Sequence, residues 1–432
     1  MRPATASWLF LVASIVGAWF TFNAHRPMPR RRHRAVLSFF AGWLTAELAI
    51  HHVVWQAVMT AVFVRAGALH AWPGVVGLGI MLGSWVGLAR CYGAAWGAER
   101  IVEGALREGL GDEYRERILP EVSAKFAPAI DWGQLVIPFR RSHPEVERVR
   151  NITYASVAGR DLKLDVYRPR SRPSGCPTLL QIHGGAWIFG SKNEQGIPLM
   201  LHLAARGWVC VSANYRLSPR ATFPDHLVDL KRALRWIREH GSEYGVNPDF
   251  VIVTGGSAGG HLAALVALTP NAPEYQPGFE HVDTSVRGCV AFYGVYDFTD
   301  RHQVWPHDGL FRLLERRVMK APRAEAVEAY EKASPISRID RDAPPFFVIH
   351  GQIDTMVPVE EARHFCRVFR ERAEAPLVYA EVPGAQHAFE IFPSVRTSFV
   401  IHGVERFLAV LYSGYLLERG RGADRGAVAT GG

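Results

Sequence analysis

Three long apolar runs occupy most of the first ninety positions of the chain. They cover residues 4–24, 35–64 and 66–89. Runs of about 20 apolar residues are long enough to cross a bilayer as helices, so the sequence predicts a transmembrane helical region over residues 1–92. The first run could instead be a signal peptide, but only Arg2 precedes it and no clear Ala-x-Ala cleavage site follows. This favours a retained span.

An arginine-rich block, residues 26–34, separates the first two apolar runs and contains no acidic residue. Loops rich in Lys and Arg stay in the cytoplasm. With three crossings, the remainder of the chain then lies on the cytoplasmic face. If the second run lies only in the interface, two crossings place it on the opposite face.

The second run is interrupted by Glu47, His51 and His52. Glu47 and His51 are four residues apart and are predicted to share a helix face. Ionisable groups inside membranes often bind metals or relay protons. The alternative is a polar pair that faces the helix bundle or its interface, and we favour it because only one carboxylate and two histidines are present.

Residues 93–144 form a charged amphipathic stretch with a break at Gly111. We interpret this stretch as a connector that lies on the membrane surface or packs on the domain that follows. Beyond it, over residues 145–415, short apolar strands alternate with helical patterns. Such alternation predicts an α/β fold in which helices cover both faces of a mostly parallel sheet, with an antiparallel hairpin at its start. Residues 299–333 lack a strand pattern and predict a helical cap, whereas the Gly-rich residues 416–432 predict a disordered tail.

Composition excludes several classes of protein. The net charge is +8, but the arginines form no basic face with interleaved aromatics, so we expect no nucleic-acid partner. The five cysteines are scattered and odd in number, which predicts neither a disulfide framework nor a zinc site. No cofactor and no metal is implied.

The stretch "VIVTGGSAGGHLAALVAL" combines a buried strand, a tight turn and a helix. Ser257 stands at the turn, within Gly255-Gly256-Ser257-Ala258-Gly259. Small neighbours are needed where the backbone turns so sharply that side chains would collide. The pattern is typical of a nucleophile elbow, which exposes a reactive serine to a substrate.

Two partners for Ser257 follow predicted strands farther along the chain. Asp354 follows the strand "PFFVIHG", and His387 lies after the last strand, in "GAQHAF". Ligands of open α/β sheets bind beyond the carboxyl ends of the strands. Asp340 and Asp342 precede their strand and are rejected. The sequence thus predicts a Ser-His-Asp triad in which His387 is the base and Asp354 orients it.

The loop "QIHGGAWIFGSK" predicts donors for an oxyanion hole. Gly184, Gly185 and Ala186 follow a strand, and their small side chains let backbone N–H groups approach a substrate. Ala258, directly after the nucleophile, adds another N–H. His183 is expected to brace this loop rather than to perform chemistry.

These motifs resemble a known family. "HGGAW", "GGSAGG", "HGQIDTMVP" and "GAQHAF", together with "NYRLSP" and "ASPIS", are similar to the hormone-sensitive-lipase-like carboxylesterases of the α/β-hydrolase superfamily. The resemblance covers residues 145–412 and implies that Ser257, Asp354 and His387 form the triad. It also implies an oxyanion hole at Gly185, Ala186 and Ala258. One departure is Ala186, where a third glycine is common.

The resulting expectation is a membrane-anchored serine esterase or lipase that cleaves a small acyl ester or a lipid. Two alternatives stay open. The "HGGAW" form also resembles arylformamidases and feruloyl-esterase-like enzymes, so an amide hydrolase could use the same triad. A ligand receptor on a hydrolase scaffold is the other alternative. The sequence leaves the natural substrate and the oligomeric state open.

Overall fold

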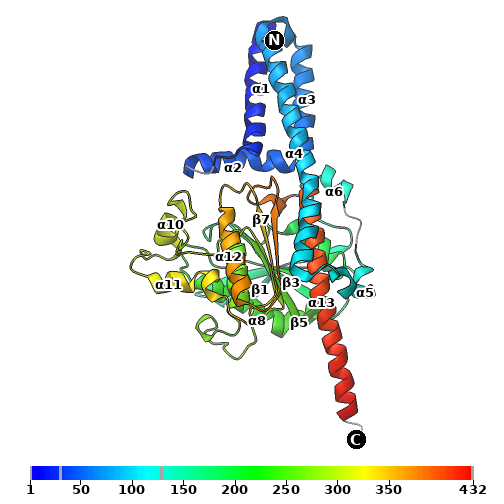
Figure 1. Ribbon diagram of the computed structural model, residues 1–432, viewed down its shortest axis with the longest axis vertical. Helices are drawn as coiled ribbons and strands as arrows, with labels where there is room; N and C mark the ends of the chain where they lie inside the picture. Colours follow the sequence, from blue (N-terminus) through cyan, green and yellow to red (C-terminus); the bar gives the residue numbers. More distant parts are fainter. Residues whose placement is uncertain (1, 29–31, 127–129, 430–432) are drawn as a thin grey trace.

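A computed structural model describes residues 2–28, 32–126 and 130–429, and places an upright helical bundle on top of an α/β domain (Figure 1). The bundle and its continuation contain α1 (Pro3–His25), α2 (Arg32–Glu47), α3 (Ala49–Arg65), α4 (Trp72–Leu110), α5 (Pro120–Ser123) and α6 (Trp132–Val136). The first strand of the sheet begins at Val146, one residue from the boundary predicted from the sequence.

The second apolar run forms two helices rather than one long span. α2 and α3 meet at Leu48 with a bend of 93°. α1, α3 and α4 stand side by side, while α2 lies across their base (Figure 1). Gly42 permits this arrangement, because a Cβ there would lie 2.9 Å from the backbone oxygen of Asn23 in α1.

α4 connects the bundle to the domain as one continuous helix of 39 residues. It ends at Leu110, and the next residue, Gly111, has a φ of 93°, which favours glycine. Gly109 lets the helix approach β8, since a Cβ there would lie 2.4 Å from the oxygen of Leu377. The predicted boundary between residues 92 and 93 therefore falls inside this helix and marks no break in the chain's path.

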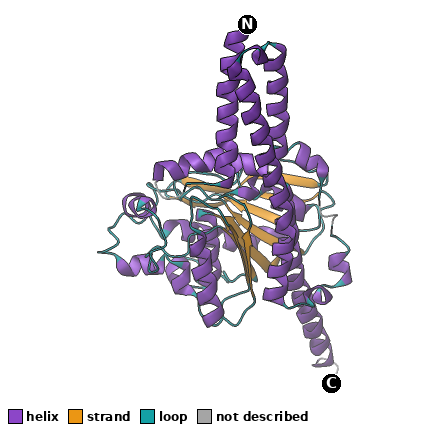
Figure 2. Ribbon diagram, turned by 45° about the horizontal axis from the view of Figure 1, so that its top comes forward, coloured by secondary structure: helices purple, strands orange, loops and turns teal. Residues whose placement is uncertain are grey.

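An eight-stranded sheet forms the centre of the domain (Figure 2). Its strands are β1 (Val146–Val157), β2 (Arg160–Pro169), β3 (Cys176–Ile182), β4 (Val209–Ala213), β5 (Val246–Gly256), β6 (Gly288–Phe292), β7 (Phe346–Gly351) and β8 (Leu377–Val382). Their order across the sheet is β1-β2-β4-β3-β5-β6-β7-β8. β2 runs opposite to both neighbours, and β3 to β8 are parallel. The mostly parallel sheet with an antiparallel hairpin is the arrangement that the sequence predicted.

Helices cover both faces of this sheet. α8 (Asp225–His240), α9 (Ala258–Leu268) and α12 (Val359–Arg372) pack on one face. α7 (Ile197–Ala204), the lower half of α4 and α13 (Val395–Ala429) pack on the other. Neighbouring side chains of β3 divide between the two cores, Leu180 facing α8 and α9 and Leu179 facing α7, as the two-residue period of a strand requires.

Two predicted segments have structure of their own. The predicted cap contains α10 (Gly309–Leu313) and α11 (Val327–Lys332) and no strand among its residues, all of which the structure describes. The segment predicted to be a disordered tail, residues 416–432, is instead helical in its described part, where α13 continues to Ala429. Helix-forming Leu, Glu, Arg and Ala residues alternate with the glycines of this segment and are compatible with the helix. Residues 430–432 lie outside the described residues.

Candidate active site

Ser257 occupies a strained turn between β5 and α9. Its φ of 60° and ψ of −124° are sparsely populated for a residue with a side chain. The small neighbours are required here. A Cβ at Gly259 would lie 2.2 Å from the backbone oxygen of Ile182, and one at Gly255 would lie 2.5 Å from the oxygen of Gly259. The sequence pattern around Ser257 thus has the steric cause that we predicted for it.

Asp354 and His387 meet at the same edge of the sheet, in the loops after β7 and β8. Oδ2 of Asp354 lies 2.7 Å from Nδ1 of His387, and both side chains are almost fully buried. Oδ1 of Asp354 accepts hydrogen bonds from the backbone N–H groups of Met356 and Val357, at 2.8 and 2.9 Å. These bonds hold the carboxylate toward the imidazole.

The electrostatic surroundings keep Asp354 ionised. Burial by itself raises the pKa of this carboxyl, but the charge of His387 and hydrogen bonds from His350 and His387 hold it well below its usual range. Nε2 of His350 lies 3.4 Å from Oδ2 of Asp354. The rejected acids, Asp340 and Asp342, are exposed and precede β7.

A cavity of about 270 Å³ lies beside these side chains, and Ser257 and His387 both line it. Much of its remaining wall is apolar, including Trp187, Ile188 and Val295. The predicted cap contributes a further part of the wall, with Trp305, His307, Gly309, Leu310 and Leu313. The cap segment therefore borders the cavity, in the place expected of it.

The glycine-rich loop after β3 borders the same cavity through Ala186. Gly185, Ala186 and Trp187 all have positive φ, so the loop makes a tight turn. Gly184 donates its N–H to the side-chain oxygen of Gln195. This N–H, which we had assigned to the oxyanion hole, is therefore already engaged. Within the described part of the chain, the N–H groups of Gly185, Ala186 and Ala258 have no hydrogen-bond acceptor.

His183 braces this loop. Its Nδ1 lies 2.7 Å from the oxygen of Gly184, and its ring stacks on that of Tyr215 with 4.4 Å between centroids. The hydroxyl of Tyr215 donates to the oxygen of His183. Burial lowers the pKa of His183 to about 4, which suits a neutral structural histidine.

Sequence reasoning missed several neighbours of His387. The ring of Tyr293 lies 4.5 Å from the imidazole, and its hydroxyl donates to Glu390. Burial raises the pKa of Glu390 to about 7. Tyr293 directly follows β6, so the rule of strand ends that led to Asp354 could also have found it. No comparable signal in the sequence marks Phe39 of α2, whose ring lies 6.2 Å from His387.

Comparison with known proteins shows the family of the chain. The probable carboxylic ester hydrolase LipM of Mycobacterium tuberculosis is 42% identical over 407 residues, which cover 93% of each chain. The chain belongs to this family of carboxylic ester hydrolases. The esterase LipQ of the same organism is 39% identical over 348 residues, 78% of this chain and 80% of LipQ. The BD-FAE family model matches residues 164–369 of the esterase.

Solved structures place the esterase in the α/β-hydrolase fold. A truncated carbohydrate esterase from gut microbiota is 25% identical, with a TM-score of 0.53, over 61% of this chain and 96% of that one. Thermogutta terrifontis esterase 2, phosphonylated by sarin, is 27% identical, with a TM-score of 0.51, over 64% and 96%. The resemblance drawn from the sequence motifs and the assignment as a carboxylic ester hydrolase are confirmed.

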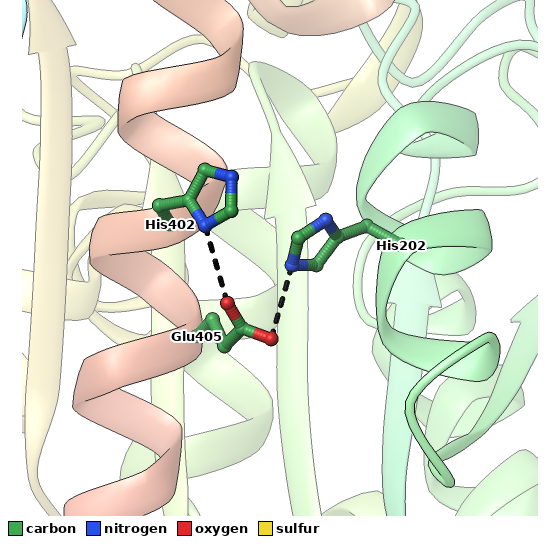
Figure 3. A group of neighbouring side chains, drawn as sticks. All are labelled: His202, His402 and Glu405. Carbon is green, nitrogen blue, oxygen red and sulfur yellow. Dashed lines mark hydrogen bonds and ion pairs between the residues drawn. The ribbon is translucent and has the colours of Figure 1, made fainter. Parts of the chain in front are cut away.

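One group of side chains has the composition of a metal site. His202 of α7 faces His402 and Glu405 of α13 (Figure 3). Each imidazole has a nitrogen 3.2 Å from a carboxylate oxygen of Glu405, and Nε of Arg206 lies 3.3 Å from the same carboxylate. Although burial opposes ionisation, hydrogen bonds from the two histidines keep the pKa of Glu405 at about 2. Because Arg206 already supplies a positive charge, we interpret the group as an ion-pair cluster that joins α7 to α13.

Glu47 and His51 do not form the pair that their spacing predicted. Glu47 ends α2 and His51 belongs to α3, beyond the 93° bend, so the two do not share a helix face. Glu47 is buried against Ser394 and Arg396 of the catalytic domain, whereas Nε2 of His51 lies 3.3 Å from the oxygen of Val136. The hypothesis that Glu47 and His51 together bind a metal or relay protons is therefore wrong.

Proposed function

We propose that the esterase is a membrane-anchored serine hydrolase in which Ser257 is the nucleophile, His387 the base and Asp354 the orienting acid. The observation that carries this proposal is the 2.7 Å contact between Asp354 and His387 beside the cavity that Ser257 also lines. A serine hydroxyl becomes a useful nucleophile when a base accepts its proton. The strained elbow holds the Ser257 side chain at that cavity.

The reaction follows from these positions. Nε2 of His387 takes the proton of Ser257 as the serine oxygen attacks the ester carbonyl, while Nδ1–H donates to Asp354. The N–H groups of Gly185, Ala186 and Ala258 then stabilise the negative oxygen of the tetrahedral intermediate. His387 returns the proton to the departing alcohol, and water hydrolyses the acyl-enzyme by the reverse sequence of transfers. Gly184 is omitted from the donors, because its N–H is bound to Gln195.

Membrane anchoring is supported by the surface of the bundle. α1 and α4 are each long and apolar enough to cross a bilayer, and the bent pair of α2 and α3 gives a third candidate. α1 alone exposes seven large apolar side chains, namely Trp8, Leu9, Val12, Ile15, Val16, Trp19 and Phe22. A water-soluble bundle rarely exposes so large an apolar surface. In this proposal α1, α3 and α4 cross the bilayer, and the arginine block over residues 26–34 holds the catalytic domain in the cytoplasm.

A labelling experiment tests the catalytic assignment. Full-length protein in detergent is treated with a fluorescent fluorophosphonate and assayed with p-nitrophenyl esters, with N-formylkynurenine and an aminoacyl amide alongside. The wild type is expected to be labelled and to prefer esters, whereas Ser257→Ala loses labelling and at least about 10⁴-fold in turnover. Ser242→Ala, at an exposed position, is the control and keeps both. Normal labelling of folded Ser257→Ala would disprove the assignment.

A further inference from the structure

α2, the helix that lies across the base of the bundle, forms part of the active-site wall. Ala35 and Val36 of α2 line the cavity that contains Ser257 and His387. The ring of Phe39, one turn farther along α2, packs edge-on against the imidazole of His387. The pocket of the esterase is thus completed by a segment outside the α/β domain.

α2 also contacts the two loops that carry the acid and the base. The hydroxyl of Thr355, next to Asp354, donates to the oxygen of Ala35 at 3.3 Å. The indole N–H of Trp43 donates to the oxygen of Ala388, next to His387, at 2.9 Å. These contacts fix α2 above the pocket and couple its position to the geometry of both loops.

A neighbouring side of α2 is apolar and uncovered. Leu37 and Phe40 are 60% and 65% exposed, one turn apart on the helix. Because α2 lies at about a right angle to α3, it runs along the bilayer surface when α3 crosses the bilayer. Exposed apolar side chains on such a helix enter the boundary between headgroups and acyl chains. One side of α2 then contacts lipid while the other contacts the active site.

We propose that the esterase takes its substrate from the bilayer, and that this substrate is an amphipathic carboxylic ester held in the membrane by an alkyl chain. Val36 and Phe39 guide the chain past α2 into the apolar pocket, where the ester carbonyl reaches Ser257. This proposal rests on the proposed function of Ser257. A water-soluble ester would not need a pocket closed by a membrane-surface helix.

The test uses two esters that share one leaving group. p-Nitrophenyl acetate is supplied in water, and p-nitrophenyl palmitate is supplied within vesicles of phosphatidylcholine and phosphatidylglycerol that contain the full-length enzyme. In the first measurement, total palmitate ester is held constant while the phospholipid is increased about tenfold. We expect the rate to fall in proportion to the mole fraction of ester in the bilayer. An unchanged rate would show that turnover does not follow the concentration of ester in the bilayer and would overturn the proposal.

The second measurement places a bulky side chain on each side of α2. Val36→Trp fills the side that lines the pocket, and Leu37→Trp, on the exposed side, is its matched control. We expect Val36→Trp to reduce turnover of the palmitate ester about tenfold more than that of the acetate ester, whereas Leu37→Trp alters the ratio by less than about twofold. Equal losses for both esters in Val36→Trp would overturn the role of α2.

Failure of the proposed function can be distinguished from failure of this inference. If the proposed function were wrong, the wild type would hydrolyse neither ester and would not react with fluorophosphonate.

Discussion

Glu47 of α2 and Arg396 of α13 form an ion pair across the junction between the helical bundle and the catalytic domain. The two side chains are 0% and 1% exposed, and the hydroxyl of Ser394 donates to the same carboxylate. A buried charge is stabilised only while its partner is present. The pair therefore fixes the orientation of α2, and with it the wall of the active-site pocket.

Removing one member of this pair should destabilise the protein strongly. Glu47→Ala leaves Arg396 buried without its partner, and we expect the free energy of unfolding to fall by about 3–5 kcal/mol. The double variant Glu47→Leu/Arg396→Met should recover most of this loss, because neither charge remains. Chemical unfolding in detergent measures both. Glu239→Ala, which breaks the exposed pair with Arg235, is the control and should cost less than about 1 kcal/mol.

Replacing Asp354, the proposed orienting acid, should impair chemistry without unfolding the protein. Asp354→Asn removes the acceptor of the His387 Nδ1 proton and favours the wrong imidazole tautomer, so we expect kcat to fall on the order of 10⁴-fold. The measurement is steady-state hydrolysis of p-nitrophenyl acetate. Asp340→Asn and Asp342→Asn should retain activity close to that of the wild type. A severe loss in either of these two would show that the acid has been misassigned.

The tight turn at Ser257 should not tolerate a larger residue at Gly259. A methyl group there would meet the oxygen of Ile182 at 2.2 Å, so the strand or the helix must move. We expect Gly259→Ala to cost about 1–3 kcal/mol of stability and to reduce kcat as well, because Ala258 shifts with it. Gly414→Ala in α13 is the matched control, since its Cβ meets nothing within 4 Å. That change should stabilise the helix by about 0.5–1 kcal/mol. Melting temperatures in detergent compare the two, and equal effects would contradict the steric argument.

Glu390 should make stability depend on pH. Burial raises its pKa from an ordinary 4.5 to about 7, so between these values the folded protein holds a proton that the unfolded chain has released. The free energy of unfolding therefore falls as the pH rises through this range. Glu390→Gln keeps an acceptor for the Tyr293 hydroxyl but does not titrate. Relative to the wild type, the variant should gain on the order of 3 kcal/mol between pH 4.5 and pH values above 7. Parallel stability curves for the two proteins would contradict this prediction.

The side of the membrane can be read with fusions at the C-terminus of the full chain. The arginine-rich residues 26–34 follow α1 in the sequence and extend into the start of α2, and α2 lies between the bundle and the catalytic domain (Figure 1). Because such blocks remain in the cytoplasm, a green fluorescent protein fusion should fluoresce and an alkaline phosphatase fusion should be inactive. An active phosphatase fusion would place the catalytic domain on the outer side.

The sequence alone determined those features that depend on neighbours along the chain. Small residues around Ser257 predicted the tight turn, because the close approach of Gly255 to the oxygen of Gly259 lies within the turn itself, whereas the approach of Gly259 to Ile182 of β3 arises only in the folded structure. Alternation of strands and helices predicted the sheet, and acids and histidines at strand ends predicted Asp354 and His387, because parallel strands end at one edge. Only the tertiary structure decided where α2 lies. Glu47 pairs with Arg396 and Phe39 contacts His387, and each of these contacts joins residues more than 300 positions apart. The bend at Leu48 places α2 where it can make them. Packing and the burial of charge select these partners among many chemically similar side chains, and no periodicity along the chain records that choice.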